Sequence, residues 1–436
     1  MAPADLPRGL PEIIAKLAER VSNVTDTRDL PFHPAAEGMF LADLHADTLL
    51  WGLDPLAGRG GGHLDGERLA VSGIGLQVFA APTWTPLPFR NDEDRLVVSK
   101  ASFDQSHALF PTELFSPARR YCQKRRGRAL RIARRFEEMV ANSRKADAPF
   151  EAVPIFAAAD LEKIDLAEPK RKIGVMLALE GLHWLEADAD EAKALAAVDE
   201  LFTAGFRMIA PTHRFSNGLG GASENSDGKG GLTQAGRRVV KMCMKRGIVL
   251  DLAHASPALI REAAGLALTR DEGPTPVIVS HAGIKAVHPA NRNLSAADIR
   301  TVAATGGLVG VGFWRSAMGW TDDEPFAAKM GRIVESFVAA LDGLREPHFV
   351  EEMEGRFGRF DPYEHLAFGS DFDGATTTAF DVTGVSYVVA ALAIAKDANG
   401  EPIFPPDKLP LIAGGNARRV LGRAMGGSVP EAAANS

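Results

Sequence analysis

Short apolar segments rich in β-branched residues recur along the chain, and stretches with helical periodicity follow several of them. Continuous apolar runs of this length are typical of parallel strands that are buried on both faces. The clearest helix candidates lie at 191–204, 233–246 and 327–344. We count eight apolar runs, at 39–46, 75–81, 173–179, 208–212, 248–253, 277–280, 308–313 and 365–369. Alternating strands and helices indicate an α/β protein, and eight units predict a closed, TIM-like (β/α)8 barrel.

The positions of these runs divide the chain into three parts of unequal length. We expect a helical N-terminal extension at 1–38, the barrel at 39–425 and a short C-terminal tail at 426–436. Strand-to-helix connections usually take only a few residues. The gap between the second and third runs therefore predicts a long insertion, at about 84–172, that covers or flanks the barrel mouth. A basic run between Arg119 and Arg135 lies in it, which we interpret as a solvated helix face, with a surface for anionic ligands as the alternative.

Composition excludes several classes of protein. The chain has 436 residues, of which 46% are hydrophobic and 24% charged, the profile of an ordinary soluble globular protein. A net charge of −7 gives no reason to expect a nucleic-acid partner. The two cysteines, Cys122 and Cys243, cannot form a disulfide framework. We find neither a secretion signal nor an apolar segment that spans a membrane, so we expect a cytoplasmic protein with reduced thiols.

Residue types that bind metals follow the predicted strands at their C-terminal ends. In a (β/α)8 barrel all of these ends point to one face of the molecule, where active sites are built. Residues that are far apart in the sequence would therefore converge there. The set comprises His45, Asp47, Glu180, His213, His254, His281, Asp371 and Asp373.

The chemistry of this set predicts a centre with two divalent metal ions. Three or more imidazoles together with carboxylates suit zinc or a similar ion. His45 and Asp47 are two positions apart on an extended chain, so their side chains leave the same side and form a chelating pair. Glu180 could bridge two ions with its two oxygens, and His254 and His281 would then hold the second ion. Two ions about 3.5–4 Å apart can share a water, lower its pKa and stabilise negative charge on a carbonyl oxygen.

Each of these residues also has a simpler explanation. A lone histidine at a strand end is often a hydrogen-bonded structural residue, and an aspartate after a strand is often the N-cap of the next helix. Packing alone does not readily place five or more such residues at successive strand ends, which favours the metal site. We leave His183 open between a contact that supports the ligands and a structural role. The remaining histidines fit surface or structural roles, namely His33, His63, His107, His288, His348 and His365.

The motifs around these residues, in their order and spacing, resemble the membrane (renal) dipeptidase family of zinc peptidases. The resemblance runs from about residue 39 to about residue 421. Its opening motif, His45-Ala46-Asp47, differs from that of the broader amidohydrolase group, which usually opens with His-x-His and often bridges its metals with a modified lysine. The further motifs are Leu179-Glu180-Gly181, Thr212-His213, Asp251-Leu252-Ala253-His254, Val279-Ser280-His281-Ala282, Asn291-Arg292-Asn293, Gly369-Ser370-Asp371-Phe372-Asp373-Gly374 and Gly414-Gly415-Asn416.

The resemblance implies a metallo-dipeptidase that hydrolyses the peptide bond of dipeptides with a hydroxide held between two zinc ions per chain. His45 and Asp47 would bind the first ion. Glu180 would bridge the two ions and belong to the catalytic set. His254 and His281 would bind the second ion.

The resemblance also implies how a dipeptide substrate is bound and cleaved. His213 would hydrogen-bond the substrate carbonyl and its developing oxyanion, and Arg292 would receive the substrate carboxylate, whose planar shape suits a guanidinium. Asp371 would carry the proton from the attacking water to the leaving amine, whereas Asp373 would order its loop. Tolerance of D-residues at the C-terminal position and a homodimer are further implications.

Two alternative functions stay open at the level of the sequence. One is another binuclear metal hydrolase of the amidohydrolase type, acting on a lactone, a cyclic imide or an N-acyl amino acid. The other is a non-catalytic barrel that serves as a binding or scaffold protein, although such proteins often lose a ligand and none of the five is missing here. Trp314 places an indole where some relatives carry a tyrosine hydroxyl, which bears on substrate preference.

Overall fold

The structure is a computed structural model of the chain. It describes residues 25–27, 29–51, 54–58, 62–83, 89–90, 96–97, 125–167, 170–224, 230–321, 323–374 and 376–426. Most of the expected N-terminal extension, nearly all of the C-terminal tail and part of the expected insertion lie outside these residues. The boundaries that we draw for these three parts therefore stay predictions.

Eight parallel strands form the closed barrel that the sequence predicts. They follow one another around the barrel in chain order, and each pairs in parallel with the next. A parallel bridge between Asp251 and Ile278 closes the circle, with a 2.7 Å hydrogen bond from the Leu252 N–H to the Ile278 carbonyl. The strands are β2 (Leu41–Ala46), β3 (Ile74–Pro82), β7 (Lys172–Glu180), β8 (Phe206–Ala210), β9 (Val249–Leu250), β10 (Ile278–Ala282), β11 (Leu308–Val311) and β12 (Leu366–Phe368).

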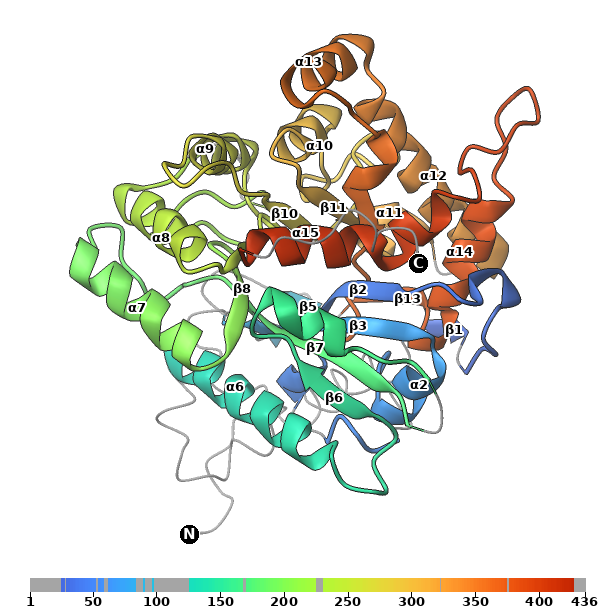
Figure 1. The fold of residues 1–436 in the computed structure, drawn as a ribbon, viewed down its shortest axis with the longest axis horizontal. Helices are drawn as coiled ribbons and strands as arrows, with labels where there is room; N and C mark the ends of the chain where they lie inside the picture. The colour runs from blue at the N-terminus through green and yellow to red at the C-terminus, as the bar shows by residue number, and fades with distance from the viewer. Residues whose placement is uncertain are drawn as a thin grey trace.

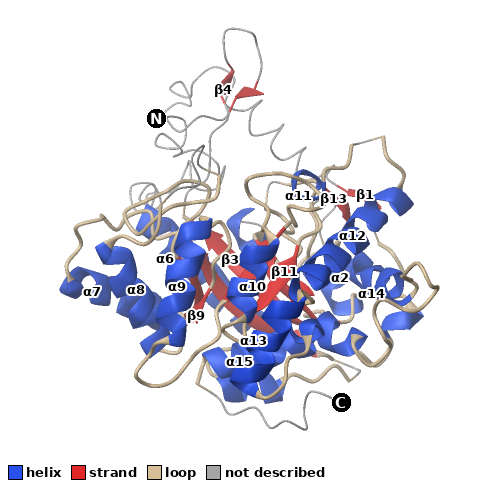
Figure 2. Ribbon diagram, turned by 90° about the horizontal axis from the view of Figure 1, so that it is seen from above, coloured by secondary structure: helices blue, strands red, loops and turns tan. Residues whose placement is uncertain are grey.

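Helices surround the strands, as the two ribbon views show (Figures 1 and 2). Helices α7, α8 and α12 confirm the three helices that periodicity predicts. The α-helices are α2 (Gly66–Val71), α6 (Arg125–Asn142), α7 (Glu191–Thr203), α8 (Gln234–Lys245), α9 (Pro257–Leu268), α10 (Ala296–Ala303), α11 (Arg315–Met318), α12 (Phe326–Leu344), α13 (Pro347–Phe357), α14 (Val385–Ala393) and α15 (Asn416–Ala424). Further short strands are β1 (Thr25–Thr27), β4 (Phe89–Arg90), β5 (Leu96–Val97), β6 (Glu151–Pro154) and β13 (Thr378–Phe380).

Polar N-caps define where four successive helices of the barrel begin. Asp190, Thr233, Ser256 and Ser295 precede α7, α8, α9 and α10, and the side chain of each accepts a hydrogen bond from the backbone N–H three residues later. Such a cap stabilises a helix by about 1 kcal/mol. The caps therefore fix the ends of the loops that leave the C-terminal ends of β7, β8, β9 and β10.

Two apolar layers hold the barrel together. Inward side chains of the strands, among them Leu44, Val78 and Met176, form one cluster with Val420 and Leu421 of α15. Helix α15 thus closes the lower end of the barrel, and in Figure 2 it lies below the strands. A second and larger cluster lies between the outward faces of the strands and the surrounding helices. Because apolar side chains fill the lower interior, only the upper end is left for polar chemistry.

The basic run is only partly the solvated helix face that we expected: Arg126 and Arg134 of α6 are exposed, whereas Arg125, Arg128 and Arg135 bind backbone carbonyls. Arg128 is buried and donates a 2.8 Å hydrogen bond to the Thr83 carbonyl, just after β3. Arg125 donates to the His183 carbonyl after β7 at 2.6 Å, and Arg135 donates to two carbonyls in the turn after β2. Carbonyls at strand ends lack ladder partners, so the guanidinium groups satisfy them. Helix α6 thereby ties together three loops at the barrel mouth.

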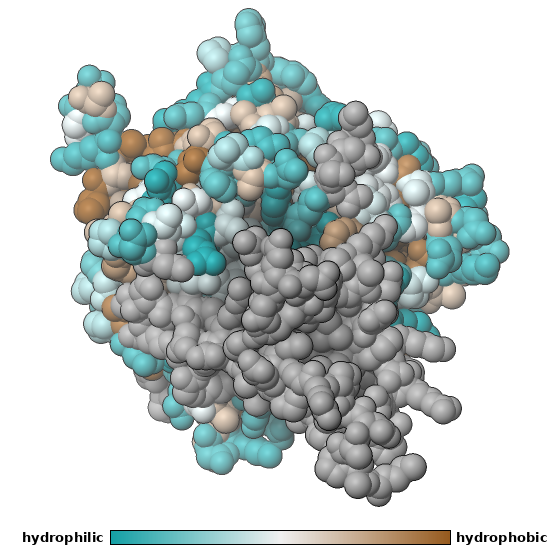
Figure 3. Space-filling view, turned by 180° about the vertical axis from the view of Figure 1, so that it is seen from behind, coloured by the Kyte–Doolittle hydropathy of each residue, from teal (hydrophilic) through white to brown (hydrophobic). Residues whose placement is uncertain are grey.

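Among the described residues, no helix combines the length and the apolar character needed to cross a bilayer. The face in Figure 3 is mainly hydrophilic over the described residues, with hydrophobic residues in separate patches. Cys243 is a free thiol buried in α8, whereas Cys122 lies outside the described residues.

A buried ionic cluster joins the loop after β2 to the loop after β13. Arg68 in α2 lies 2.8 Å from Asp65 and 2.8 Å from Asp381. The Asp381 carboxylate also accepts a hydrogen bond from the backbone N–H of Asp29 at 3.2 Å. All three charged side chains of the cluster are buried. Removal of one partner from such a cluster leaves a buried charge without compensation, which is strongly destabilising.

We predict that Arg68→Met lowers the free energy of unfolding by about 3–5 kcal/mol, because Asp65 and Asp381 then stay buried without a cation. Denaturant unfolding of purified variants measures the change. Arg126→Met is the matched control, since Arg126 pairs with Glu200 at the surface and such pairs contribute about 1 kcal/mol or less. Equal losses in the two variants would show that the buried cluster has no special role.

Candidate metal centre

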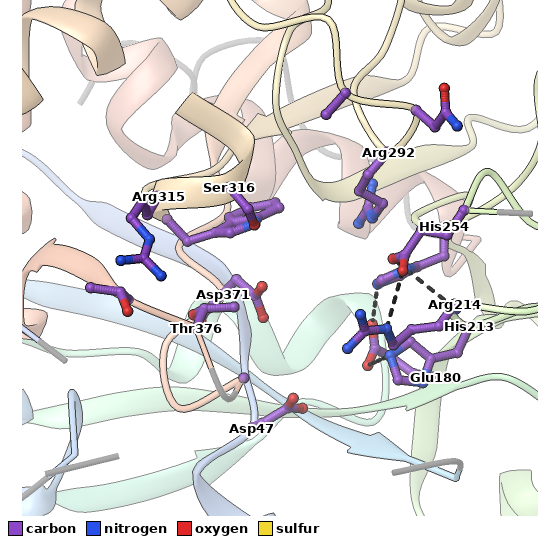
Figure 4. Close-up of a pocket in the computed structure, with 16 residues that line it drawn as sticks. Asp47, Glu180, His213, Arg214, His254, Arg292, Arg315, Ser316, Asp371 and Thr376 are labelled. Atoms are coloured by element: carbon purple, nitrogen blue, oxygen red, sulfur yellow. Dashed lines mark hydrogen bonds and ion pairs between the residues drawn. The ribbon is translucent and has the colours of Figure 1, made fainter. Parts of the chain in front are cut away.

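The side chains that we expected to bind a metal or a substrate converge at the C-terminal ends of the barrel strands. All are buried except Arg292, which is partly exposed. Figure 4 shows several of them around a common hollow. In chain order they are His45 in β2, Asp47 directly after it, Glu180 at the end of β7, His213 after β8, His254 after β9, His281 in β10, Arg292 in the next loop and Asp371 after β12.

Glu180 lies at the centre of this group. Its Oε1 lies 3.2 Å from Nε2 of His254 and 3.6 Å from Nε2 of His281. The same oxygen lies 3.7 Å from Nε2 of His45, and Oε2 lies 3.4 Å from Nε2 of His213. Imidazoles from four separate parts of the chain therefore surround one carboxylate.

The ligand atoms fall into three groups, within each of which all atoms lie within 4.8 Å of one another. Two of the groups match the two sets that the sequence predicts, and Glu180 belongs to both. The third group joins Asp371 to His45 and His281, which the sequence does not predict; Asp371 Oδ1 lies 3.9 Å from His45 Nε2. The two expected groups are His45, Asp47 and Glu180, and Glu180, His254 and His281.

Burial keeps the imidazoles in the form that can bind a metal. Desolvation, with the positive charge of Arg292 as the second cause, lowers the pKa of His45 to about 3. Desolvation also lowers the pKa of His254 and of His281 well below the ordinary value. These rings are therefore neutral at neutral pH, and a neutral imidazole has a nitrogen lone pair to donate.

The carboxyl groups of the centre repel one another. Burial, followed by neighbouring carboxylates, raises the pKa of Asp47 and of Glu180 well above the ordinary value. Burial raises the pKa of Asp371 to about 8, against the opposing charge of Arg292. A divalent cation between these groups would stabilise their ionised forms.

The donor set fits metal ions in a second respect. His45 Nε2, Asp47 Oδ1 and Glu180 Oε1 are buried, and none has a hydrogen-bond partner among the described residues. Buried polar atoms are nearly always hydrogen-bonded in folded proteins. Three such atoms at one point, all of them lone-pair donors, are the ligand types that zinc and similar ions take.

Buried polar contacts hold the loop that carries Asp371. The Asp43 carboxylate accepts hydrogen bonds from the Ser370 N–H at 2.8 Å and from its hydroxyl at 2.7 Å. The Asp373 carboxylate accepts from the N–H of His63 at 2.6 Å, and His63 Nδ1 accepts from the Asp373 N–H at 2.8 Å. Asp373 thus orders its loop, as we expected, and the structural role expected of His63 is confirmed.

His183 lies near His213. Its ring centroid is 6.5 Å from that of His213, and burial lowers its pKa to about 3. The turn that brings it there requires Gly181, since φ is +78° and a Cβ would lie 2.4 Å from the His183 ring. Both roles that we left open for His183 stay predictions, and the site residue that its ring approaches here is His213.

A cavity of about 530 Å³ opens over the centre, which is large enough for a small molecule. Arg292 and Trp314 line one side of it, and the guanidinium carbon of Arg292 lies 5.9 Å from the centre of the Trp314 ring. Arg292 also donates a 2.8 Å hydrogen bond to the His281 carbonyl, which fixes its position. His213 and Asp371 also line this cavity (Figure 4).

Sequence reasoning missed three charged residues that line this cavity, Arg214, Glu224 and Arg315. Arg214 Nε lies 3.1 Å from Glu224 Oε2, and Glu224 Oε1 lies 3.2 Å from His254 Nδ1. The position of Arg214 next to His213 is a signal that could have identified it. No motif marks Glu224, because its place depends on how the loop after β8 folds back over the site.

Four residues of the site have a backbone conformation that side chains rarely adopt. The φ angles of Arg214, His254, Asp371 and Asp373 are +47°, +61°, +61° and +59°. For a residue other than glycine this conformation costs on the order of 1 kcal/mol or more. Such strain concentrates at functional sites, and here all four residues lie just beyond strand ends, where the chain turns around the cavity.

The fold and the site define a (β/α)8 barrel with a candidate metal centre at its upper end. A family model described as membrane dipeptidase (peptidase family M19) matches residues 33–426. The chain therefore belongs to the membrane dipeptidase family, as the resemblance of its motifs implies.

Individual relatives are distant. Dipeptidase verJ from Clonostachys rogersoniana is 31% identical over 219 residues, which cover 49% of this chain and 47% of that protein. The chain thus spans about half the length of this curated relative. An uncharacterized protein in the pqqA 5′ region of Klebsiella pneumoniae is 25% identical over 243 residues, which cover 54% of this chain and 78% of that protein.

Solved structures of the family share the fold. A metallopeptidase from Rhodobacter sphaeroides, liganded with a phosphinate mimic of the dipeptide L-Ala-D-Ala, aligns with a TM-score of 0.60 and 23% identity. The alignment covers 88% of this chain and 99% of that one. The dipeptidase AC of family M19 aligns with a TM-score of 0.59 and 22% identity, over 89% of this chain and 100% of the other.

The raised pKa of Asp371 predicts how pH changes the stability of the metal-free protein. Its pKa is about 8 in the folded protein and 3.8 in its ordinary state, so the folded protein keeps a proton that the unfolded chain has released. This contribution to stability is complete at low pH and is lost as pH rises to about 8, with a slope of up to about 1.4 kcal/mol per pH unit. Denaturant unfolding after chelation measures it between about pH 5 and about pH 8.

Asp371→Asn serves as the comparison, because the variant lacks the titrating group and keeps the shape. The free energy of unfolding should then fall less steeply with pH than in the unchanged protein. Identical slopes in the two proteins would contradict the assigned pKa.

Proposed function

We propose that the protein is a metal-dependent dipeptidase that uses two zinc ions to hydrolyse the peptide bond of dipeptides. One observation carries the proposal: two sets of buried ligands share Glu180 at the base of a cavity that Arg292 also lines. Membership of the membrane dipeptidase family supports the same reaction.

His45 and Asp47 would hold one ion, His254 and His281 would hold the other, and Glu180 would contact both. When bound, the two ions would lower the pKa of a water and supply positive charge for the developing oxyanion. The fold presents these ligands in advance, because four of the five lie in strands or directly after them. A ligand set that is held in place loses little entropy when it binds.

Arg292 would select the free carboxylate of a dipeptide. A guanidinium binds a carboxylate through two parallel hydrogen bonds, and Arg292 faces the cavity while its bond to the His281 carbonyl fixes it. His213 is neutral, because burial lowers its pKa well below the ordinary value. As a neutral donor it would hydrogen-bond the substrate carbonyl oxygen and then stabilise the oxyanion.

Asp371 would move the proton. The ionised carboxylate of Asp371 would be favoured by bound cations, and it could then accept a proton from the attacking water and give it to the departing amine. Its Oδ1 lies 3.9 Å from His45 Nε2, at the edge of the ligand cluster, and its side chain lines the cavity. The group therefore stands between the ligands and the space that a substrate would fill.

We further propose that a D-residue is accepted at the C-terminal position of the dipeptide. The resemblance to the family supports this, as does the related metallopeptidase that is liganded with a phosphinate mimic of L-Ala-D-Ala. The cytoplasmic location and the homodimer stay predictions.

We predict that the purified protein hydrolyses L-Ala-L-Ala and L-Ala-D-Ala, and that chelation lowers the rate at least about 100-fold, because the metal ions supply several kcal/mol to the transition state. Addition of zinc to the chelated protein should restore the rate. The control substrates are the amides of the same dipeptides, in which a C-terminal amide replaces the carboxylate that Arg292 would bind. The absence of metal-dependent cleavage of any dipeptide would contradict the proposal.

We predict that Asp371→Asn keeps both metal ions and loses about 10²- to 10⁴-fold in kcat, the range of a general acid–base group. Elemental analysis and steady-state kinetics measure the two effects on the same preparation. The structure offers a sharp alternative outcome, because Asp371 also lies in a potential ligand group with His45 and His281. Loss of an ion from the variant would make Asp371 a ligand and remove the evidence for proton transfer.

A further inference from the structure

A buried chain of hydrogen bonds ends on the ring of His281. Asp251 follows β9 and is 2% exposed. Its Oδ1 accepts from the N–H groups of Ser280 at 2.8 Å and Ala253 at 3.0 Å, and its Oδ2 accepts from the Ser280 hydroxyl at 2.6 Å. The Ser280 Oγ lies 2.9 Å from His281 Nδ1. Neither Asp251 nor Ser280 has a part in the chemistry described above.

With Asp251 ionised, this chain of hydrogen bonds has a single direction. An ionised carboxylate accepts hydrogen bonds and donates none, so the Ser280 hydroxyl must give its hydrogen to Asp251. The Oγ can then only accept toward His281, which places the ring hydrogen on Nδ1. The lone pair of His281 is therefore on Nε2, the nitrogen that lies 3.6 Å from Glu180.

The neighbouring ligand is arranged in the same sense. His254 Nδ1 lies 3.2 Å from a Glu224 carboxylate oxygen and 3.5 Å from the Arg214 backbone N–H, and the shorter contact, with an acceptor, assigns its ring hydrogen to Nδ1 as well. The Nε2 atoms of His254 and His281 lie 3.2 Å apart. Two lone pairs thus face each other at hydrogen-bond distance, an arrangement that a cation between them or beside them stabilises.

We propose that Asp251 is a positioning residue that acts through Ser280 to fix the Nδ1–H tautomer of His281, so that Nε2 stays available as a metal ligand. The proposal rests on the proposed function only in taking His281 as a metal ligand. Partners of this kind set the orientation and basicity of ligating imidazoles.

A second pair in the fold, Asp43 and Ser370, makes the same aspartate–serine contact but does not lead to a histidine ring within the part of the chain that the structure describes. Asp43 holds Ser370 through its N–H at 2.8 Å and its hydroxyl at 2.7 Å, as Asp251 holds Ser280. Ser370 precedes Asp371 in the chain as Ser280 precedes His281, but no hydrogen bond joins Ser370 to a ring among the described residues. Loss of a buried Asp–Ser contact can therefore be separated from loss of control over a tautomer.

Asp251→Asn is the decisive variant, because it keeps the shape of the side chain and reverses the direction of the hydrogen bonds that lead to His281. The amide oxygen would still accept hydrogen bonds from the two backbone N–H groups, and the amide nitrogen would donate one to the Ser280 Oγ. Ser280 would then give its hydrogen to His281 Nδ1, which moves the ring hydrogen to Nε2. A flipped amide would instead set its NH2 group against two N–H donors, which is unfavourable.

The test uses the metal-free full-length protein with ¹⁵N-labelled histidine. NMR spectra should show His281 with its hydrogen on Nδ1 in the unchanged protein and on Nε2 in Asp251→Asn, and a His281→Asn variant assigns the signal. Calorimetric titration with zinc should show a 10- to 100-fold weaker affinity for one of the two ions in Asp251→Asn. Ser280→Ala should lose less zinc affinity than Asp251→Asn. It removes the hydroxyl that joins Asp251 to His281, but it places no donor against His281 Nδ1.

Asp43→Asn is the control: it should lower the thermal midpoint of unfolding and leave the His281 tautomer unchanged. An unchanged tautomer in Asp251→Asn, or an equal change in Asp43→Asn, would overturn the proposal. If Asp251→Asn does not fold, Ser280→Ala and Ser370→Ala make the same comparison, and equal zinc affinities in these two variants would overturn it. The tautomer is read without substrate, so an inactive protein would contradict the proposed function and leave this result intact.

Discussion

Glu180 lies where ligands from separate strands meet, and one of its oxygens is within 3.7 Å of three imidazole nitrogens. None of these rings is protonated at neutral pH, so among the side chains that act on the centre Arg292 and Arg214 supply the main positive charge. The cluster does not stabilise the fold by itself, because buried carboxyls repel one another. The surrounding structure must therefore hold it.

In several of the supporting contacts, a polar side chain hydrogen-bonds the backbone at a strand end or the serine that precedes a site residue. The guanidinium groups of α6 bind carbonyls in three loops of the barrel mouth. Asp43 and Asp251 each hold the serine that precedes a site residue, and Asp251 also carries the bridge that closes the barrel. Asp251 therefore contributes both to the geometry of the centre and to the closure of the barrel.

The sequence predicts most of the fold and the main members of the site, for a physical reason. Strands buried on both faces must be apolar throughout, so all eight appear as apolar runs, including β9, whose ladder is only two residues long. Ligands at strand ends share a position relative to those runs. What the sequence cannot predict is set by tertiary contacts: the carbonyls that Arg125, Arg128 and Arg135 satisfy, the return of the loop with Glu224, and the approach of Asp371 to His45.

The left-handed backbone of Arg214, His254, Asp371 and Asp373 lowers the stability of the fold at the candidate site. Folding alone would favour glycine at these positions, since each side chain there costs on the order of 1 kcal/mol. Together the four residues lower the free energy of unfolding by several kcal/mol. This is a large share of the 5–15 kcal/mol by which a typical domain is stable. A variant that no longer needs the site could become more stable to heat if these four residues were replaced by glycine. Heat resistance obtained by such replacements would therefore signal a lost site, whereas resistance gained in the lower core would not.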